Sequence, residues 1–168
     1  MGAKHLSKRK NWQTVTSAKV AKNEKRTRTL LVESLNSKKF EITIKPTVLI
    51  GKLTLKPELV VKNPRTGAKV IIDDKLGNNG GNAHERCYKY CTGKVEKAGY
   101  KPLIIFSGKT FASKKPYSYK DKKGKKIKVN PQRYRDEFEE LLDPEQYFIL
   151  TGNNGKDLCD KIEELLTQ

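Results

Sequence analysis

Residues 57–75 read PELVVKNPRTGAKVIIDDK, two apolar runs on either side of the turn signal NPRTG. Asn, Pro and Gly favour tight turns, so the two runs are predicted to pair as a β-hairpin. Side chains alternate along a strand, which puts Asp73 and Lys75 on one face and Asp74 on the other. The hairpin would also bring Glu58 back beside Asp73. Two carboxylates and one ammonium are therefore predicted at one strand end.

This acid–lysine group has the composition of a magnesium site for phosphodiester hydrolysis. Glu58 and Asp73 would hold the cation, which prefers oxygen ligands and keeps several waters. The metal would polarise a phosphate and lower the pKa of a bound water, while Lys75 would steady the nucleophile or the developing charge. Acids and lysines at strand ends are also ordinary solvated residues, so spacing alone leaves that alternative open.

The segments around the hairpin alternate between strand and helix patterns. Strands are predicted at 39–45, 48–55, 102–108 and 146–150, and helices at 12–36, 131–142 and 156–166. A further helix is expected to end near Gly99. Residues 1–10 are expected as a basic arm and residues 109–130 as an exposed hairpin or loop. The sequence thus predicts a single α/β domain over residues 1–168, with a central mixed β-sheet flanked by helices.

The charge balance points to a polyanionic partner. The 168 residues include 36 Lys and Arg against 19 Asp and Glu, a formal net charge of +17. Nucleic acid is therefore expected ahead of a membrane. No apolar stretch approaches the roughly 20 residues of a membrane-spanning helix, and no apolar segment follows the charged N-terminus as in a signal peptide. With only three cysteines, a disulfide scaffold is not expected. A reducing, cytoplasmic setting is expected instead.

A second motif, GGNAHERCYKYC at residues 80–91, follows the hairpin. Its glycines let the backbone approach a ligand closely, and Asn82 can cap a helix. Asn82 and Arg86 are four residues apart and would share a helical face. A helix N-terminus favours phosphate, Asn can pair with adenine, and Arg can bind purine edges. A capped helix with an ordinary salt-bridging arginine is the alternative.

Together, GGNAHER and the PE…DDK hairpin resemble the restriction endonucleases of the EcoRI and MunI type, within the PD-(D/E)XK nuclease superfamily. The likeness continues in the same order through LSKRKNWQ, KP at 45–46, PLIIFSG and YFIL with the helix after it. It implies a homodimeric, Mg²⁺-dependent type II enzyme of a restriction–modification system. Such an enzyme hydrolyses double-stranded DNA at a short palindrome, here expected to contain AATT. It would act in the cytoplasm of a prokaryotic or virus-infected cell. Beyond the metal, the resemblance implies no small-molecule cofactor.

By position in the motif, Glu58 stands for the family's Asp, Asp73 for its usual Glu, and Lys75 for the lysine. Both acids are exchanged relative to the pattern, and our hypothesis is that the two opposite changes in length compensate. Where related proteins carry an Arg before Gly-Asn, this chain has Gly80. The resemblance assigns base recognition to Asn82, Ala83, His84, Glu85 and Arg86, with Arg133 and Arg135 in a downstream segment.

Residues 109–130 are rich in lysine and are expected to contact DNA phosphates, although a solvated loop is the alternative. The residues assigned to the DNA backbone are Lys109, Lys114, Lys115, Tyr117, Lys122 and Lys123. Within this region, SGKT at 107–110 lacks the first glycine of a P-loop. A zinc site is a further hypothesis, although helical spacing explains its first three residues equally well as a half-buried face. Its ligands would be His84, Cys87, Cys91 and Cys159.

Two other functions stay open at this point. The exchanged acids are compatible with a catalytically silent, sequence-specific DNA-binding protein on the same fold. The lysine content is compatible with a basic RNA-binding protein, which would leave GGNAHER and the acid pair unexplained.

Overall fold

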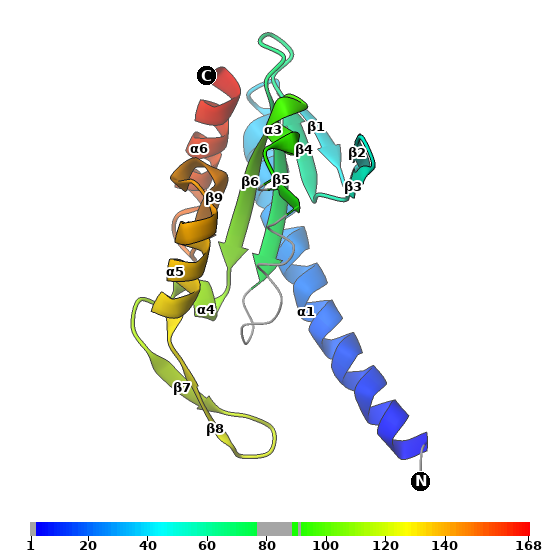
Figure 1. Cartoon of the computed structure of the whole chain (residues 1–168), viewed down its shortest axis with the longest axis vertical. Coiled ribbons are helices and arrows are strands. Elements are labelled where there is room, and N and C mark those ends of the chain that lie inside the picture. The colour runs from blue at the N-terminus through cyan, green and yellow to red at the C-terminus, as the bar shows by residue number, and fades with distance from the viewer. Residues whose placement is uncertain (1–2, 77–88, 91) are drawn as a thin grey trace.

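The computed structural model describes residues 3–76, 89–90 and 92–168. Its centre is a five-stranded sheet in the order β1-β4-β5-β6-β9 (Figure 1). The strands are β1 (Glu41–Ile44), β4 (Leu59–Lys62), β5 (Lys69–Leu76), β6 (Tyr100–Ser107) and β9 (Tyr147–Leu150). The pairs β1·β4 and β4·β5 are antiparallel, whereas β5·β6 and β6·β9 are parallel. The predicted mixed sheet is confirmed.

The hairpin β4–β5 forms around the predicted turn. Leu59 pairs with Ile72, and the register continues to the turn. There the amide of Asn63 donates to the carbonyl of Ala68 at 2.9 Å, and the amide of Gly67 donates to the carbonyl of Asn63 at 2.8 Å. Gly67 has φ 79°, a left-handed conformation that glycine adopts without a steric penalty. The turn chemistry therefore fixes the register that positions the acids.

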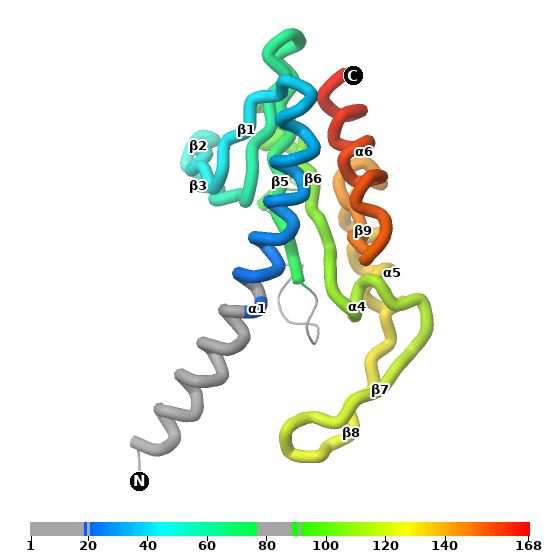
Figure 2. The backbone as a smooth tube through the Cα atoms, turned by 180° about the vertical axis from the view of Figure 1, so that it is seen from behind, coloured from blue at the N-terminus to red at the C-terminus, as the bar shows by residue number. Residues whose placement is uncertain are grey.

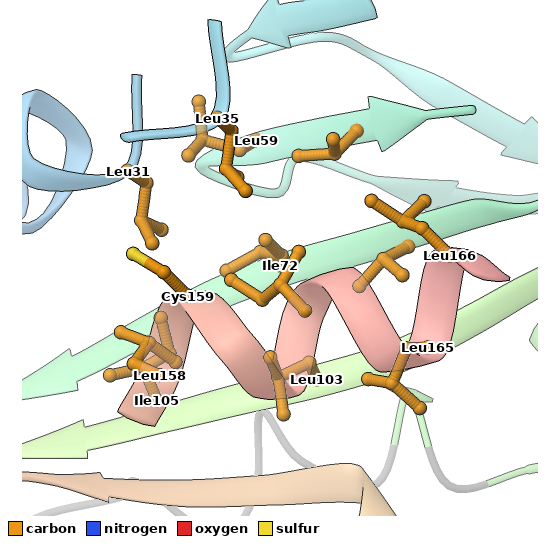
Figure 3. Packing of buried hydrophobic residues seen from close by; sticks show 13 residues of the cluster. Leu31, Leu35, Leu59, Ile72, Leu103, Ile105, Leu158, Cys159, Leu165 and Leu166 are labelled. Carbon is orange, nitrogen blue, oxygen red and sulfur yellow. The ribbon is translucent and has the colours of Figure 1, made fainter. Parts of the chain in front are cut away.

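Helices cover both faces of the sheet. The first face carries α1 (Ala3–Asn36) and α6 (Gly155–Thr167), which lie together in front of the sheet in Figure 2. Their leucines pack with Ile72 and Leu103 in a buried cluster (Figure 3). The second face carries α3 (Lys94–Lys97), α4 (Lys109–Ala112) and α5 (Pro131–Leu141) over Ile104 and Phe106. As predicted, the middle of β6 is buried on both faces.

The structure differs from the sequence-based prediction at the start of α1 and at residues 48–55. Helix α1 begins at Ala3, so residues 3–10, expected as a basic arm, are helical. Residues 48–55 were expected as one strand but form two, β2 (Val48–Ile50) and β3 (Leu53–Leu55). The cause is Gly51, whose φ of 59° reverses the chain.

The remaining elements agree with the prediction except for α4 (Lys109–Ala112), which forms where an exposed hairpin or loop was expected and buries Phe111, and for a 3₁₀ turn that was not predicted. Residues 109–130 contain the expected hairpin, made of β7 (Tyr117–Lys120) and β8 (Lys126–Val129) after the short α4. A 3₁₀ turn, η1 (Pro144–Gln146), leads into β9. Within the described residues, no helix combines the length and apolarity that crossing a membrane requires.

Candidate active site

The hairpin register places Glu58 next to Asp73. Glu58 immediately precedes β4, and its amide donates to the carbonyl of Ile72 at 2.9 Å. Its own carbonyl accepts the amide of Lys45 at 2.9 Å, which ties it to the end of β1. On β5, the Lys75 ammonium and the Asp73 carboxylate form an ion pair. The three residues predicted as an acid–lysine group are therefore brought together.

These three side chains line a pocket of about 480 Å³. Asp73 and Lys75 are each only 8% exposed, although both carry charge. Burying charged groups is costly unless they are paired, so the ion pair is what makes this arrangement tolerable. The rest of the lining comes from α1, the β2–β3 hairpin and the residues before α3, namely Glu24, Thr54, Leu55, Lys56, Lys89 and Tyr90.

Glu24 is a residue of this pocket that the sequence reasoning missed. It lies on α1 one turn before Arg28, whose Nη1 is 3.4 Å from Glu58 Oε2. Lys45 Nζ lies 3.8 Å from Glu24 Oε2 and 3.9 Å from Glu58 Oε2. Helical spacing does place Glu24 and Arg28 on one face. Nothing in the sequence, however, links that face to the start of β4.

Like charges gather in the pocket and perturb Glu58. Burial raises the pKa of the Glu58 carboxyl, and repulsion from Glu24 raises it further. Lys45 lowers this pKa, while a hydrogen bond to Glu24 and the charge of Asp73 raise it. The balance is upward. A divalent cation between these carboxylates would relieve the repulsion, which adds to the effect of burial on this pKa.

The carboxylates of this pocket suit a magnesium ion that keeps several of its waters better than a metal ion held by protein ligands alone. Among the described residues, no three His, Cys, Asp or Glu side chains are arranged to hold a metal ion by themselves. Magnesium commonly uses only one or two carboxylates and completes its shell with waters and substrate phosphates. Glu58 and Asp73 are such a pair. Of the residues proposed for zinc, Cys159 is buried in the core and the other three lie outside the described residues.

Asp74 faces away from the pocket, as the strand alternation predicts. Its Oδ2 accepts Asn23 Nδ2 at 3.0 Å and its Oδ1 accepts the Ser107 hydroxyl at 3.3 Å. Asn23 Nδ2 also donates to Ser107 Oγ at 2.8 Å, so α1, β5 and β6 meet at one polar contact. Burial raises the pKa of Asp74 to about 6, against hydrogen bonds from Thr27 and Ser107 that lower it.

The residues predicted to contact DNA are only partly described. The segment assigned to base recognition, Asn82, Ala83, His84, Glu85 and Arg86, lies outside the described residues. Arg133 is exposed and its Nε is 3.7 Å from Glu137 Oε1. Arg135 Nη2 donates to the carbonyls of Phe111 at 3.0 Å and Ser113 at 3.4 Å. Base contact by either arginine stays a prediction.

The six residues predicted to contact the DNA backbone fall into two groups. The ammonium of Lys109 stacks over the ring of Tyr117 at 4.5 Å, and the Tyr117 hydroxyl is 3.2 Å from Thr110 Oγ1. Both residues thus have partners within the protein. The other four are exposed around the β7–β8 hairpin: Lys114, Lys115, Lys122 and Lys123.

Comparison with solved structures finds a similar chain in the crystal structure of MunI restriction endonuclease in complex with cognate DNA. The TM-score is 0.57 at 16% identity, covering 93% of this chain and 97% of that chain. A crystal structure of AF1548, a protein of unknown function, matches at TM-score 0.42 and 15% identity, over 80% of this chain and 64% of the other. The sequence matches no protein-family model and no curated protein. The chain therefore has a restriction-endonuclease-like fold, as predicted.

Proposed function

We propose that this chain is a Mg²⁺-dependent nuclease that hydrolyses double-stranded DNA. The observation that carries the proposal is the grouping of Glu58, Asp73 and Lys75 along one pocket at the end of β5. This grouping sits in a fold shared with MunI, whose structure contains cognate DNA. Paired carboxylates with a lysine are suited to in-line attack of water on a phosphodiester.

Each residue has a role in the proposed reaction. Glu58 and Asp73 would hold Mg²⁺, which when bound polarises the phosphate and lowers the pKa of water. Arg28 and Lys45 hold the Glu58 side chain in place from outside the pocket. Lys75 exchanges its contact with Asp73 for the attacking water or a phosphate oxygen, where its charge offsets the negative charge of the transition state.

The oligomeric state and the recognition site are proposed from the sequence resemblance. The protein would be a homodimer of a restriction–modification system, and its recognition site would be a palindrome that contains AATT. A two-fold dimer presents the same surface to each half of a palindrome, so both properties belong together. The residues proposed to read the bases are Asn82, Ala83, His84, Glu85 and Arg86, together with Arg133 and Arg135.

Incubating plasmid DNA with the protein and Mg²⁺, and then sequencing the fragment ends, tests the proposal. We expect discrete fragments whose ends share one palindrome, and no cleavage when EDTA removes the metal. Lys75→Ala should abolish cleavage while duplex binding persists. Lys94→Ala, which removes an exposed lysine from α3, is the matched control and should cleave normally. Absence of discrete fragments across buffers and temperatures would refute the proposal.

A DNA-binding protein without catalysis is the second candidate. The specific observation in its favour is that protein cations already engage the acids: Lys75 pairs with Asp73, while Arg28 and Lys45 contact Glu58. In that case the protein would select an AATT-containing duplex and leave it intact at every Mg²⁺ concentration. Cleavage that disappears on Lys75→Ala excludes it.

A further inference from the structure

The hairpin β7–β8 has two chemically different faces. Its register pairs Ser118 with Lys128 and Lys120 with Lys126, and residues directly opposite each other share a face. We call these four exposed residues the lysine face. The alternate positions form the other face, which is half-buried or buried and consists of Tyr117, Tyr119, Ile127 and Val129.

Positive charge on this hairpin is concentrated and uncompensated. Residues 117–129 contain six lysines and one acid, Asp121. That acid is engaged in the turn, since its Oδ1 accepts the amides of Lys123 at 2.8 Å and Lys125 at 2.9 Å. Within the described part of the chain, the lysine face forms no ion pair.

Lys120 and Lys126 stand directly opposite each other in the ladder. Like charges in that position destabilise a strand pair. A free-standing hairpin gains nothing from this arrangement, whereas a bound polyanion would remove the repulsion. The charge pattern therefore indicates a surface that is completed by an anionic partner.

The hairpin is anchored firmly at its base. The Tyr117 hydroxyl forms a hydrogen bond with the Thr110 hydroxyl, and the Lys109 ammonium forms a cation–π contact with the Tyr117 ring. Arg135, from α5, donates to the carbonyls of Phe111 and Ser113, at the point where the chain leaves α4. These contacts fix the direction of the hairpin. It projects past the edge of the sheet at which β5 and β6 end (Figures 1 and 2).

Asp73 and Lys75 lie near that same edge, at the end of β5. A duplex lying across this edge would meet both the pocket and the hairpin. Residues 117–129 contain no arginine, so the forked contacts that read base edges are missing from the hairpin. Lysine ammonium groups contact phosphate as point charges, without sequence preference.

We propose that the lysine face is a sequence-independent contact surface for the phosphates of duplex DNA, separate from the acid–lysine pocket. The inference rests on the proposed function, because it takes duplex DNA as the substrate. It also revises which residues of this region contact the backbone. Lys120, Lys126 and Lys128 carry the contact, whereas Lys109 and Tyr117 anchor the hairpin.

The test measures binding to a duplex that lacks AATT, without Mg²⁺, over a series of salt concentrations. The variant Lys120→Gln/Lys126→Gln removes the opposed pair. The matched control, Lys94→Gln/Lys97→Gln, removes two exposed lysines from α3, at the far end of the molecule in Figure 1. Each lost phosphate contact lowers the slope of log K against log salt by about 0.9. We therefore expect the slope of the hairpin variant to fall by about 2, and the control to match the wild type.

Lys120→Arg/Lys126→Arg should restore the wild-type slope, because it keeps the charge. Equal slopes for the hairpin variant and the wild type overturn the inference, as does a wild type that binds no duplex DNA or prefers duplex RNA. The outcome is separable from that of the proposed function. Cleavage with unchanged slopes refutes only the lysine face, and a reduced slope without any cleavage refutes only the nuclease.

Discussion

The buried carboxylate of Asp74 should make the stability of this protein fall as the pH rises from about 4 to 6. Asp74 is 4% exposed, and its pKa is raised from 3.8 to about 6, mainly by burial. The folded state therefore binds the proton more tightly than the unfolded state between these values. The contribution of Asp74 to the free energy of unfolding falls through this window and is constant above it. About two pKa units at 1.36 kcal/mol each correspond to a loss of about 3 kcal/mol.

Asp74→Asn removes the ionisation and isolates this effect. Asparagine keeps an acceptor for the Ser107 hydroxyl but places an NH₂ group near the amide of Asn23, which donates to Asp74 in the wild type. Losing that hydrogen bond costs about 1 kcal/mol. At pH 7.5 the variant avoids the cost of ionising Asp74, about 3 kcal/mol, and loses one hydrogen bond, about 1 kcal/mol. It should thus be more stable than the wild type by about 2 kcal/mol. At pH 3.5 it should be less stable by about 1 kcal/mol.

Urea unfolding at both pH values measures these differences, provided that the m-values agree. Asp160→Asn is the control, because it removes an exposed carboxylate on α6 and changes the net charge equally. A stability difference between Asp74→Asn and wild type that has the same sign and size at both pH values would refute the reasoning. So would a stability difference between Asp74→Asn and the wild type that does not grow between pH 4 and 6.

Two further predictions concern the core and the pocket. Phe106→Ala removes a ring that is 1% exposed and lies 4.5 Å from the ring of Phe138, and should cost about 3–5 kcal/mol in urea unfolding. Leu49→Ala, at a side chain that is 70% exposed, should cost far less, and equal losses would contradict the packing. Glu24→Gln removes a neighbouring negative charge and should lower the pKa of Glu58, as followed by carboxyl ¹³C NMR titration. An unchanged titration would show that the two carboxyls do not interact.

The hairpin and its acids were predictable because their information is local. NPRTG sets the turn, period-two alternation sets the faces, and together they place Glu58 opposite Asp73. The same alternation correctly separated Asp74 from the pocket. Strand β6 was equally predictable, since an unbroken apolar run is what a strand buried on both faces requires.

The contribution of α1 to the pocket was not predictable in this way. Glu24 and Arg28 are recognisable as neighbours on a helix, but their contact with Glu58 depends on how α1 packs across the sheet. That packing is decided by leucines such as Leu31 and Leu35, whose apolar side chains give no indication of the charged residues nearby. A helical pattern specifies which face is apolar without specifying which strand it covers.

The lysine-rich region shows a second limit of sequence reasoning. Composition alone cannot distinguish a cation that contacts the protein from one that faces solvent. Lys109, although exposed, contacts the ring of Tyr117, and Arg135 donates to two carbonyls. Lys120 and Lys126, which the sequence did not single out, are exposed and form no ion pair among the described residues. Only the β7–β8 register divides these residues by face.

The charges of the pocket and of the hairpin are arranged in opposite ways. At the pocket, each of the acids Glu24, Glu58 and Asp73 has a cationic partner: Lys45 lies near Glu24, Arg28 and Lys45 near Glu58, and Lys75 near Asp73. In the hairpin, six lysines lie beside one acid that is engaged in a turn. An approaching polyanion is therefore attracted first to the hairpin, which extends past the sheet. The proposed nuclease would bind a small divalent cation at the pocket, where its charge would lower the repulsion among the acids and between them and a phosphate. On the proposed function, this separation lets a DNA-binding surface keep the carboxylates that hydrolysis requires.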